Sequence, residues 1–268
     1  MKRALSALIV VVSSLLLAGP GLTGEKPAAK VTIVWHGQSF FEIKSSKGTN
    51  IVMDPHLIPA YGRVQGVKAD IVLISHNHND HTQIGALENA KEKNFKVIPG
   101  LKGAGLRADW NLVKEQVKDV KIRTLGLYHD TEQGLKYGRN TAFILEVDGW
   151  RIVNLGDLGH LLTPEQIKKI GPVDVLMLPV GGIYTLNGAE AKKVVDQLKP
   201  KEYIFPQHYG TKVYDELLGP DEFMEAFPRA NVTSSLDNTI TLNRDPQRPR
   251  PLVVQLHYWP RGGKKEAK

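Results

Sequence analysis

Hydrophobic and polar positions divide the chain into short strands first and then into strands that alternate with helices. After residue 30, β-rich segments alternate with turn-forming residues, and residues 71–75 form a continuous apolar run typical of a strand buried on both faces. Further strands are predicted at residues 31–35, 39–44, 50–53, 96–98, 121–127, 141–148, 150–155, 174–180 and 203–205. Residues 239–242 and 252–256 are predicted as late edge strands.

Helical spacing of apolar residues occurs in four places. Residues 82–93 and 221–227 show this spacing without a strong start signal. Thr163 with Gln166 and Asn187 with Glu190 have the spacing of capping boxes, in which the first side chain binds the backbone of the third helical residue. These signals predict helices over residues 164–170 and 188–199.

The order of these elements predicts an α/β protein with two sheets covered by helices. The sequence has no short internal repeat and no linker rich in Gly, Pro or Ser that would separate two domains. Residues 25–260 are therefore expected to form a single domain.

The first 24 residues are typical of a secretory signal peptide. Lys2 and Arg3 precede an apolar segment over residues 4–18, and small residues follow it. This segment is shorter than the roughly 20 apolar residues of a membrane-spanning helix. A buried N-terminal helix and an uncleaved anchor are the alternatives. We expect export to the bacterial periplasm or the extracellular space, with no membrane span after cleavage.

The net charge of +7 comes mostly from the two ends of the chain. Lys2 and Arg3 contribute two positive charges, and residues 261–268, a basic tail predicted to be disordered, contribute a net three. The remaining body is close to neutral, so the sequence does not predict a nucleic-acid partner. The chain contains no Cys, which excludes thiol nucleophiles and metal sites with Cys ligands. Any bound metal must be held by His, Asp and Glu.

A cluster of metal-binding side chains follows the apolar run at residues 71–75. His76, His78, Asp80 and His81 occur within six residues. Imidazole nitrogens with carboxylate oxygens suit borderline divalent metals such as zinc. The alternative is a His-rich surface turn without an ordered metal.

This His-x-His-x-Asp-His segment after a buried strand resembles the metallo-β-lactamase-fold hydrolases. The resemblance implies a four-layer αββα fold, in which two mixed β-sheets are sandwiched by helices. It also implies two divalent metal ions, with zinc expected and Mn, Fe or Ni as alternatives. The implied ligands are His76, His78 and His129 for the first ion, Asp80, His81 and His208 for the second, and Asp157 between the two.

Other segments resemble the UlaG-like branch of that family, which includes the ascorbate-6-phosphate lactonase. They are residues 35–40, 53–55, 178–182 followed by Thr185, and 208–211. The resemblance extends over about residues 31–256. It implies hydrolysis of a lactone or another ester.

Four further residues are candidates for supporting roles. The family pattern implies that His36 lies beside the metals as a catalytic group, although a hydrogen-bonded structural His is equally compatible with the sequence. Asp54 is expected to orient a ligand His or to cap the turn at Pro55. Tyr184 would act at the mouth of the site or pack in a loop. His160 would support the site or lie on the surface.

Four functions remain open from the sequence. The first is hydrolysis of a small-molecule ester or lactone, with Asp80 both binding one metal and orienting the attacking water. The others are phosphodiester hydrolysis, β-lactam-type amide hydrolysis, and metal binding without catalysis. A homo-oligomer is compatible with all four.

Overall fold

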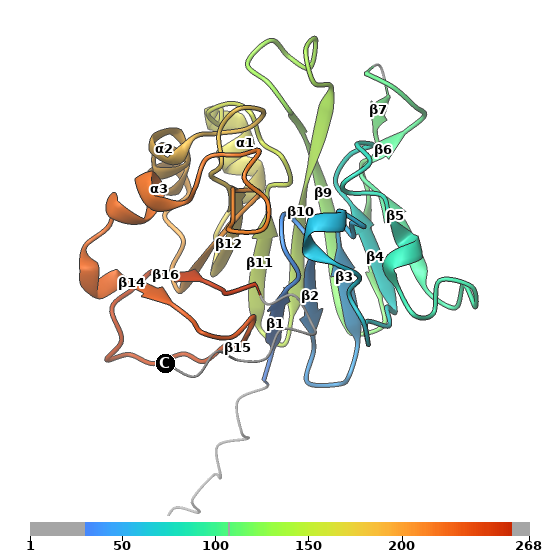
Figure 1. Ribbon diagram of the computed structural model, residues 1–268, viewed down its shortest axis with the longest axis horizontal. Coiled ribbons are helices and arrows are strands. Elements are labelled where there is room, and N and C mark those ends of the chain that lie inside the picture. Colours follow the sequence, from blue (N-terminus) through green and yellow to red (C-terminus); the bar gives the residue numbers. More distant parts are fainter. Residues whose placement is uncertain (1–29, 107, 259–268) are drawn as a thin grey trace, which may run out of the picture.

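The computed structural model describes residues 30–106 and 108–258. Two mixed β-sheets lie face to face in this part of the chain (Figure 1). The six-stranded sheet has the order β15-β1-β2-β3-β4-β5. Its strands are β1 (Thr32–Trp35), β2 (Phe41–Lys44), β3 (Asn50–Met53), β4 (Ile71–Ile74), β5 (Lys96–Pro99) and β15 (Thr239–Thr241).

The eight-stranded sheet has the order β14-β16-β13-β12-β11-β10-β9-β8. Its antiparallel half contains β8 (Lys114–Val117), β9 (Val120–Tyr128), β10 (Arg139–Val147) and β11 (Trp150–Asn154). Its parallel half contains β12 (Val175–Pro179), β13 (Tyr203–Gln207), β14 (Val232–Ser234) and β16 (Leu252–Gln255). The short strands β6 (Leu101–Lys102) and β7 (Asp109–Trp110) pair separately.

Three α-helices, which follow β11, β12 and β13 in the chain, cluster beside the eight-stranded sheet (Figure 1). They are α1 (Pro164–Ile170), α2 (Gly188–Leu198) and α3 (Asp221–Glu225). The predicted capping boxes of Thr163 and Asn187 are both present, with reciprocal side-chain to backbone bonds. The structure therefore confirms both predicted helices. They could be predicted because each start signal is complete within four residues of sequence.

The predicted helix over residues 82–93 is wrong. Only the 3₁₀ turn η2 (Ile84–Ala86) forms there, and Leu87 has extended backbone angles. The Asn89 side chain then accepts from the Ala69 N–H at 3.1 Å and donates to the Ala69 carbonyl at 2.8 Å. These bonds to a distant segment hold the chain out of a helix, which local spacing could not reveal.

The helical layer over the six-stranded sheet is therefore reduced. Within the described residues, the outer face of this sheet is covered by η1 (Pro59–Tyr61), η2 and loops. A small apolar cluster lies beneath them, made of Phe40, Val52, Val64, Val67, Ala69, Val72, Ile74, Ala86 and Leu87. The predicted α/β fold with two mixed sheets is confirmed, with fewer helices than the four-layer description implies.

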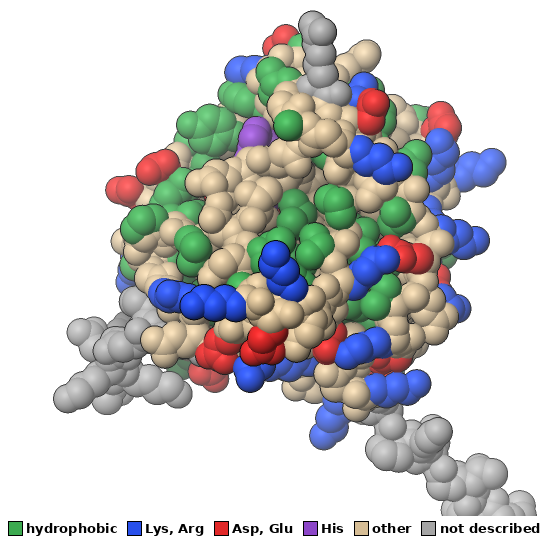
Figure 2. Space-filling model, turned by 90° about the vertical axis from the view of Figure 1, so that its right-hand side faces the viewer, with side chains coloured by type: hydrophobic (Ala, Val, Ile, Leu, Met, Phe, Trp, Pro, Cys, Tyr) green, Lys and Arg blue, Asp and Glu red, His purple; other side chains and the backbone are tan. Residues whose placement is uncertain are grey.

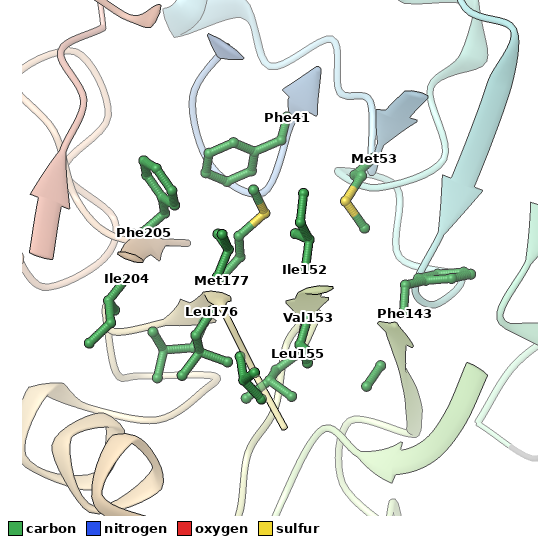
Figure 3. Close-up of a cluster of buried hydrophobic side chains, with 14 of the residues drawn as sticks. Phe41, Met53, Phe143, Ile152, Val153, Leu155, Leu176, Met177, Ile204 and Phe205 are labelled. Carbon is green, nitrogen blue, oxygen red and sulfur yellow. The ribbon is translucent and has the colours of Figure 1, made fainter. Parts of the chain in front are cut away.

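The main core fills the space between the two sheets. Phe41 and Met53 of the six-stranded sheet face Ile152, Met177 and Phe205 of the other sheet (Figure 3). All five are almost completely buried. Packing across this layer fixes the position of one sheet against the other, and with it the loops at their ends.

Some predictions differ in detail from the structure or lie outside it. Residues 252–256 are predicted as an edge strand, but in the structure this strand, β16, lies between β13 and β14. The sequence pattern does not reveal β14, which pairs with the outer edge of β16. Residues 1–24 and the basic tail at 261–268 lie outside the described residues. Among the helices that the structure describes, none is long and apolar enough to span a membrane.

Candidate metal centre

The seven candidate ligands lie just beyond the ends of four strands. His76, His78, Asp80 and His81 follow β4, and His129 follows β9 directly. Asp157 lies three residues after β11, and His208 directly follows β13. The two sheets bring these strand ends to one end of the molecule, so Asp80 and His208, which are 128 positions apart, come within 3.8 Å of each other.

The carboxylate of Asp157 lies at the centre of this cluster. Its Oδ2 atom is 3.1 Å from His81 Nε2, 3.1 Å from His208 Nε2 and 3.2 Å from His129 Nε2. The Nε2 atom of His76 is 3.8 Å from the same oxygen. Asp157 and these four imidazoles are buried.

Three overlapping groups in the cluster have the geometry to hold a metal ion, with their ligand atoms within 4.8 Å of one another. They are His76, His78 and His129, then His76, His81 and Asp157, and then Asp80, His81 and His208. The first and third groups match the two ligand sets implied by the family resemblance. The second shares residues with both and contains Asp157.

The contacts around Asp157 fit a cation better than hydrogen bonds alone. One carboxylate oxygen has about two acceptor positions, so it cannot satisfy three imidazole nitrogens at 3.1–3.2 Å. His81 Nε2 is buried and has no hydrogen-bond partner among the described residues. Leaving such a group unsatisfied is costly, and a metal ion between the nitrogens and the carboxylate would remove that cost.

Hydrogen bonds to the far side of the rings orient two of the imidazoles. His129 Nδ1 lies 3.2 Å from the Tyr184 carbonyl oxygen, and His76 Nδ1 lies 2.9 Å from Ser75 Oγ. An N–H at Nδ1 that donates to the Tyr184 carbonyl leaves the Nε2 lone pair of His129 free to bind a metal.

Asp54 contacts a third imidazole, that of His81. Its Oδ2 atom is 3.3 Å from His81 Nδ1, and its Oδ1 atom accepts from the Ser75 N–H at 2.6 Å. The buried Asp54 carboxylate therefore contacts both a candidate ligand and the backbone that leads to His76. This is the arrangement of a carboxylate that orients a metal-binding His.

The charges of the cluster shift the pKa values of its members in opposite directions. Burial lowers the pKa of His76 well below its usual value, and the neighbouring His81 adds to this effect, so His76 remains neutral. Burial would raise the pKa of Asp157, but His208 and His81 outweigh it and hold the pKa well below the usual range. Asp157 is therefore ionised, and neutral imidazole with carboxylate is the protonation state that binds divalent metals.

Asp80 and His81 form the other charged part of the cluster. Burial opposes ionisation of Asp80, but His81 and a hydrogen bond from His208 lower its pKa. Burial also opposes the charge on His81, but Asp157, Asp80 and Asp54 raise the pKa of His81 well above its usual value. Three carboxylates around one imidazole make this part of the cluster strongly negative, so His81 is protonated when no metal is bound. A metal ion held here would take the place of that proton.

Three amide side chains that the sequence analysis did not single out hold the loop before Asp157. Asn140 donates to the Leu155 carbonyl at 2.7 Å and accepts from the Asp157 N–H at 3.2 Å. Asn154 accepts from the Gly156 N–H at 2.7 Å, and Gln207 donates to the Gly156 carbonyl at 3.0 Å. No local spacing marks these residues, because they come from three different strands, β10, β11 and β13, and meet only at this loop.

Gly156 is required at the centre of this network. Its φ angle is +53°, and a Cβ atom there would lie 2.3 Å from Asn140 Oδ1. A larger residue would therefore displace the backbone that leads to Asp157.

The three remaining candidates from the sequence differ in whether they reach the pocket beside the cluster. Tyr184 lines the pocket beside the cluster. His36 is buried with its Nε2 atom 3.3 Å from Glu42 Oε2, and it does not line the pocket. His160 accepts from the Tyr128 N–H at 3.2 Å, so it supports the backbone next to His129 without lining the pocket.

A pocket of about 380 Å³ opens over the cluster. Five candidate ligands line it, together with five apolar or aromatic residues. These ten residues are His78, Asp80, His129, Asp157, His208, Ile58, Tyr137, Tyr184, Tyr214 and Leu217. Of the second five, the sequence analysis proposed only Tyr184. Tyr137 and Tyr214 belong to loops whose position depends on the whole fold.

A comparison with protein families identifies the chain. The Beta-lactamase superfamily domain matches residues 32–208, which is most of the described chain and contains all seven candidate ligands. The chain belongs to the metallo-beta-lactamase superfamily. Within it, similarity to curated relatives places the chain among the UPF0173 metal-dependent hydrolases.

Two relatives and one solved structure illustrate this similarity. The UPF0173 metal-dependent hydrolase of Thermococcus onnurineus is 33% identical over 201 residues, covering 68% of this chain and 85% of the relative. That of Pelotomaculum thermopropionicum is 31% identical over 221 residues, covering 75% and 92%. A metallo-beta-lactamase superfamily crystal structure from Thermotoga maritima is 31% identical with a TM-score of 0.62, covering 85% of this chain and all of that one. The chain is therefore a metal-dependent hydrolase, as the sequence predicted.

Proposed function

We propose that this hydrolase holds two divalent ions, with zinc as the native metal, and cleaves carboxylic esters, lactones foremost, as in the UlaG-like branch. The observation that carries the two-ion proposal is the position of Asp157 Oδ2, within 3.2 Å of His129 from one ligand set and of His81 and His208 from the other. A carboxylate in contact with both sets would supply a ligand to an ion held by either of them. The choice of zinc is supported by the similar Thermotoga maritima protein, which is described as a Zn-dependent hydrolase.

His76, His78 and His129 would hold one ion, and Asp80, His81 and His208 the other. When bound, a pair of such ions lowers the pKa of a water molecule toward neutrality and polarises the carbonyl under attack. The protein keeps Asp157 ionised between the two sets and fixes the rings through Asp54 and the Tyr184 carbonyl.

Asp80 has a second role in this proposal. Its side chain is 36% exposed while its pKa is lowered by His81 and His208, so it remains an ionised acceptor at the floor of the pocket. It can therefore accept a hydrogen bond from the attacking water and orient it toward the ester carbonyl.

The pocket wall favours a carboxylic ester over a phosphodiester. Among the described residues, no Lys or Arg lines the pocket, whereas three Tyr, Ile58 and Leu217 do. A phosphodiester carries a negative charge that a site usually neutralises with cationic side chains as well as metals. An uncharged ester needs none.

The test is a substrate comparison on the purified protein loaded with zinc or with manganese. We expect turnover of p-nitrophenyl acetate and of simple γ- and δ-lactones, little turnover of bis-(p-nitrophenyl) phosphate or a chromogenic β-lactam, and two zinc ions per chain by mass spectrometry. Hydrolysis of the phosphodiester alone would overturn the ester assignment. One ion per fully active chain would overturn the two-ion site.

We also propose that the protein is exported through residues 1–24. The Lys2-Arg3 start and the apolar segment at residues 4–18 support this, and the family match begins only at residue 32. N-terminal sequencing of the protein from the periplasm of an expressing bacterium should find a start near residue 25. Full-length protein confined to the cytoplasm would contradict export.

A further inference from the structure

The wall of the pocket is apolar wherever it is not made of candidate ligands. Ile58, Leu217 and three tyrosines form this wall above the metal-binding floor. Tyr137 and Tyr184 pack edge to face with their ring centroids 5.6 Å apart, which forms a continuous aromatic surface on one side. A substrate that reaches the floor therefore passes along hydrophobic side chains.

Four exposed hydrophobic residues lie within two positions of residues that line the pocket. Leu57 is next to Ile58, Leu135 is two residues before Tyr137, Ile183 precedes Tyr184, and Leu218 follows Leu217. These four residues, which we call the apolar rim, are between 41% and 77% exposed. With Tyr184 they make up five of the nine large exposed hydrophobic residues that the structure describes, so more than half of such residues belong to the segments that form the pocket wall.

The fold brings two parts of the rim that are distant in sequence next to each other. The Leu218 N–H donates to the Gly181 carbonyl at 2.9 Å, and a Cβ atom on Gly182 would lie 3.0 Å from Leu218 Cδ1. Leu218 therefore lies beside the turn that carries Ile183. Figure 2 shows hydrophobic side chains beside a histidine near the upper edge of the molecule, above a flank rich in Lys, Arg, Asp and Glu.

Ile183 adds an independent observation. Its φ angle is +62°, a left-handed conformation that is strained for a β-branched residue. Its side chain is 54% exposed, so little burial offsets this strain. Strained residues of this kind occur at ligand contacts, where the surrounding structure holds a side chain in a set position.

We infer that the substrate is an ester or lactone with an extended apolar acyl group, which lies along the apolar rim while its carbonyl reaches the metal-binding floor. This inference rests on the proposed ester hydrolysis and adds the substrate class. Lys136 is a cation beside this wall, with its Nζ atom 4.7 Å from the centroid of the Tyr137 ring, but it does not line the pocket. The described lining residues therefore offer no cationic side chain to an anionic acyl group, which favours an uncharged one.

The first experiment measures kcat and KM of the zinc-loaded protein for p-nitrophenyl acetate, butanoate and octanoate. Each methylene group that is fully buried strengthens binding up to about fourfold, and the rim would bury an acyl chain only in part. We therefore expect kcat/KM to rise roughly tenfold or more from acetate to octanoate. Most of this rise should come from a lower KM. Turnover of all three at equal kcat/KM would overturn the acyl-group inference and leave ester hydrolysis intact. Absence of turnover for all three would instead overturn the proposed function.

Variants of two rim residues test whether this surface binds the acyl chain. Leu218→Ser and Ile183→Asn should raise KM for the octanoate severalfold and leave KM for the acetate unchanged, because only the longer chain reaches the rim. Asn accepts a left-handed backbone better than Ile, so Ile183→Asn should also keep or raise the melting temperature, which separates lost binding from misfolding. Leu112→Ser is the matched control, since Leu112 is an exposed leucine between β7 and β8, in a segment that contributes no residue to the pocket.

A binding measurement provides a readout without turnover. Calorimetric titration of the zinc-loaded protein with acetohydroxamate and octanohydroxamate should give a Kd about tenfold lower for the octanoyl compound. Leu218→Ser should remove most of this difference, and Leu112→Ser should keep it. Equal affinities of the two hydroxamates, or an equal loss in both variants, would overturn the role of the rim.

Discussion

Single residues in a left-handed backbone conformation turn the chain at the metal centre. Gln38, Asp54 and His208 have φ angles of +48°, +45° and +48°, and each lies close after a strand. This conformation is uncommon for residues other than Gly and costs free energy, so the surrounding packing must hold it. It redirects the Asp54 and His208 side chains from the sheet toward the cluster.

At this scale we predict that Asp80→Ala and His208→Ala each lose one metal ion per chain. Both residues belong to the same candidate ligand group, so removing either leaves too few ligands for that ion. Activity should fall by roughly a hundredfold or more, given that even residues supporting a ligand typically cost 10–100-fold. Metal content by mass spectrometry checks this, with Asp196→Ala on the exposed face of α2 as the control. Parental metal content in both ligand variants would refute their assignment.

A second prediction concerns buried His56, whose Nδ1 accepts from the Ile58 N–H at 3.2 Å and whose Nε2 lies 3.2 Å from the Gly37 carbonyl. Burial lowers the pKa of His56 to about 4. Between pH 6.5 and 4 the unfolded chain therefore binds more protons here, so this group lowers the free energy of unfolding as the pH falls, by up to about 3 kcal/mol.

The variant His56→Gln lacks this titration. Urea unfolding of the parent and the variant at pH 7.5, 5.5 and 4.5 measures the effect. The parent should be more stable at pH 7.5, and its advantage should shrink as the pH falls. An advantage that is constant across the three pH values would show that His56 does not titrate as proposed.

At the scale of elements, one carboxylate organises the loop between β9 and β10. Asp130 accepts hydrogen bonds from four backbone N–H groups of residues 132–137, at 2.7–3.0 Å. Burial would raise the pKa of Asp130, but these bonds outweigh it and lower the pKa. The loop that carries Tyr137 into the pocket wall is held by a residue adjacent to His129.

We therefore predict that Asp130→Asn loosens this wall. The amide has one acceptor oxygen, and its NH₂ group would face backbone donors, so two of the four bonds are lost at a cost of about 1–3 kcal/mol in unfolding free energy. KM for an ester substrate should rise severalfold with a smaller change in kcat. Enzyme kinetics and thermal unfolding check this prediction, with Asp196→Asn as the control variant. An unchanged KM would contradict the positioning role of Asp130.

The elements that the sequence predicted well are those specified locally. The capping boxes at Thr163 and Asn187 and the apolar run before His76 are each complete within a few residues. The failed helix at residues 82–93 depends instead on Asn89 contacting Ala69. Tyr137 and Asn140 could not be predicted as parts of the site for the same reason, since the loop of Tyr137 is held by Asp130 and the Asn140 side chain acts through the loop after β11.

At the scale of the whole molecule, the centre joins the two sheets. Ligands from the β4 loop belong to the six-stranded sheet, whereas His129, Asp157 and His208 follow strands of the eight-stranded sheet. Ser39 Oγ also donates to Asp157 Oδ1 across this boundary, at 3.3 Å. Metal binding should therefore stabilise the packing of one sheet against the other.

The corresponding prediction is that removing metal lowers the melting temperature of the whole protein. At a metal concentration of about 1,000 times Kd, binding adds about 4 kcal/mol to the unfolding free energy, which corresponds to roughly 10 °C for a chain of this size. Scanning calorimetry with and without a chelator measures the decrease in melting temperature, and the same measurement after zinc is added back measures its recovery. A melting temperature that is unchanged after verified metal removal would contradict the coupling.

The sequence by itself determined the class of fold and the His-x-His-x-Asp-His segment after β4, because each is carried by a pattern that is complete within a short stretch of chain. His129, Asp157 and His208 were named only through the resemblance to the metallo-β-lactamase-fold hydrolases, since no local pattern marks them. Only the tertiary structure decided which ligands share an oxygen of Asp157, which way His36 and His160 face, and that tyrosines and leucines from four loops surround the metal centre. Those contacts depend on how two sheets pack together, and pairs of residues that meet only through such packing leave no periodic signal along the chain.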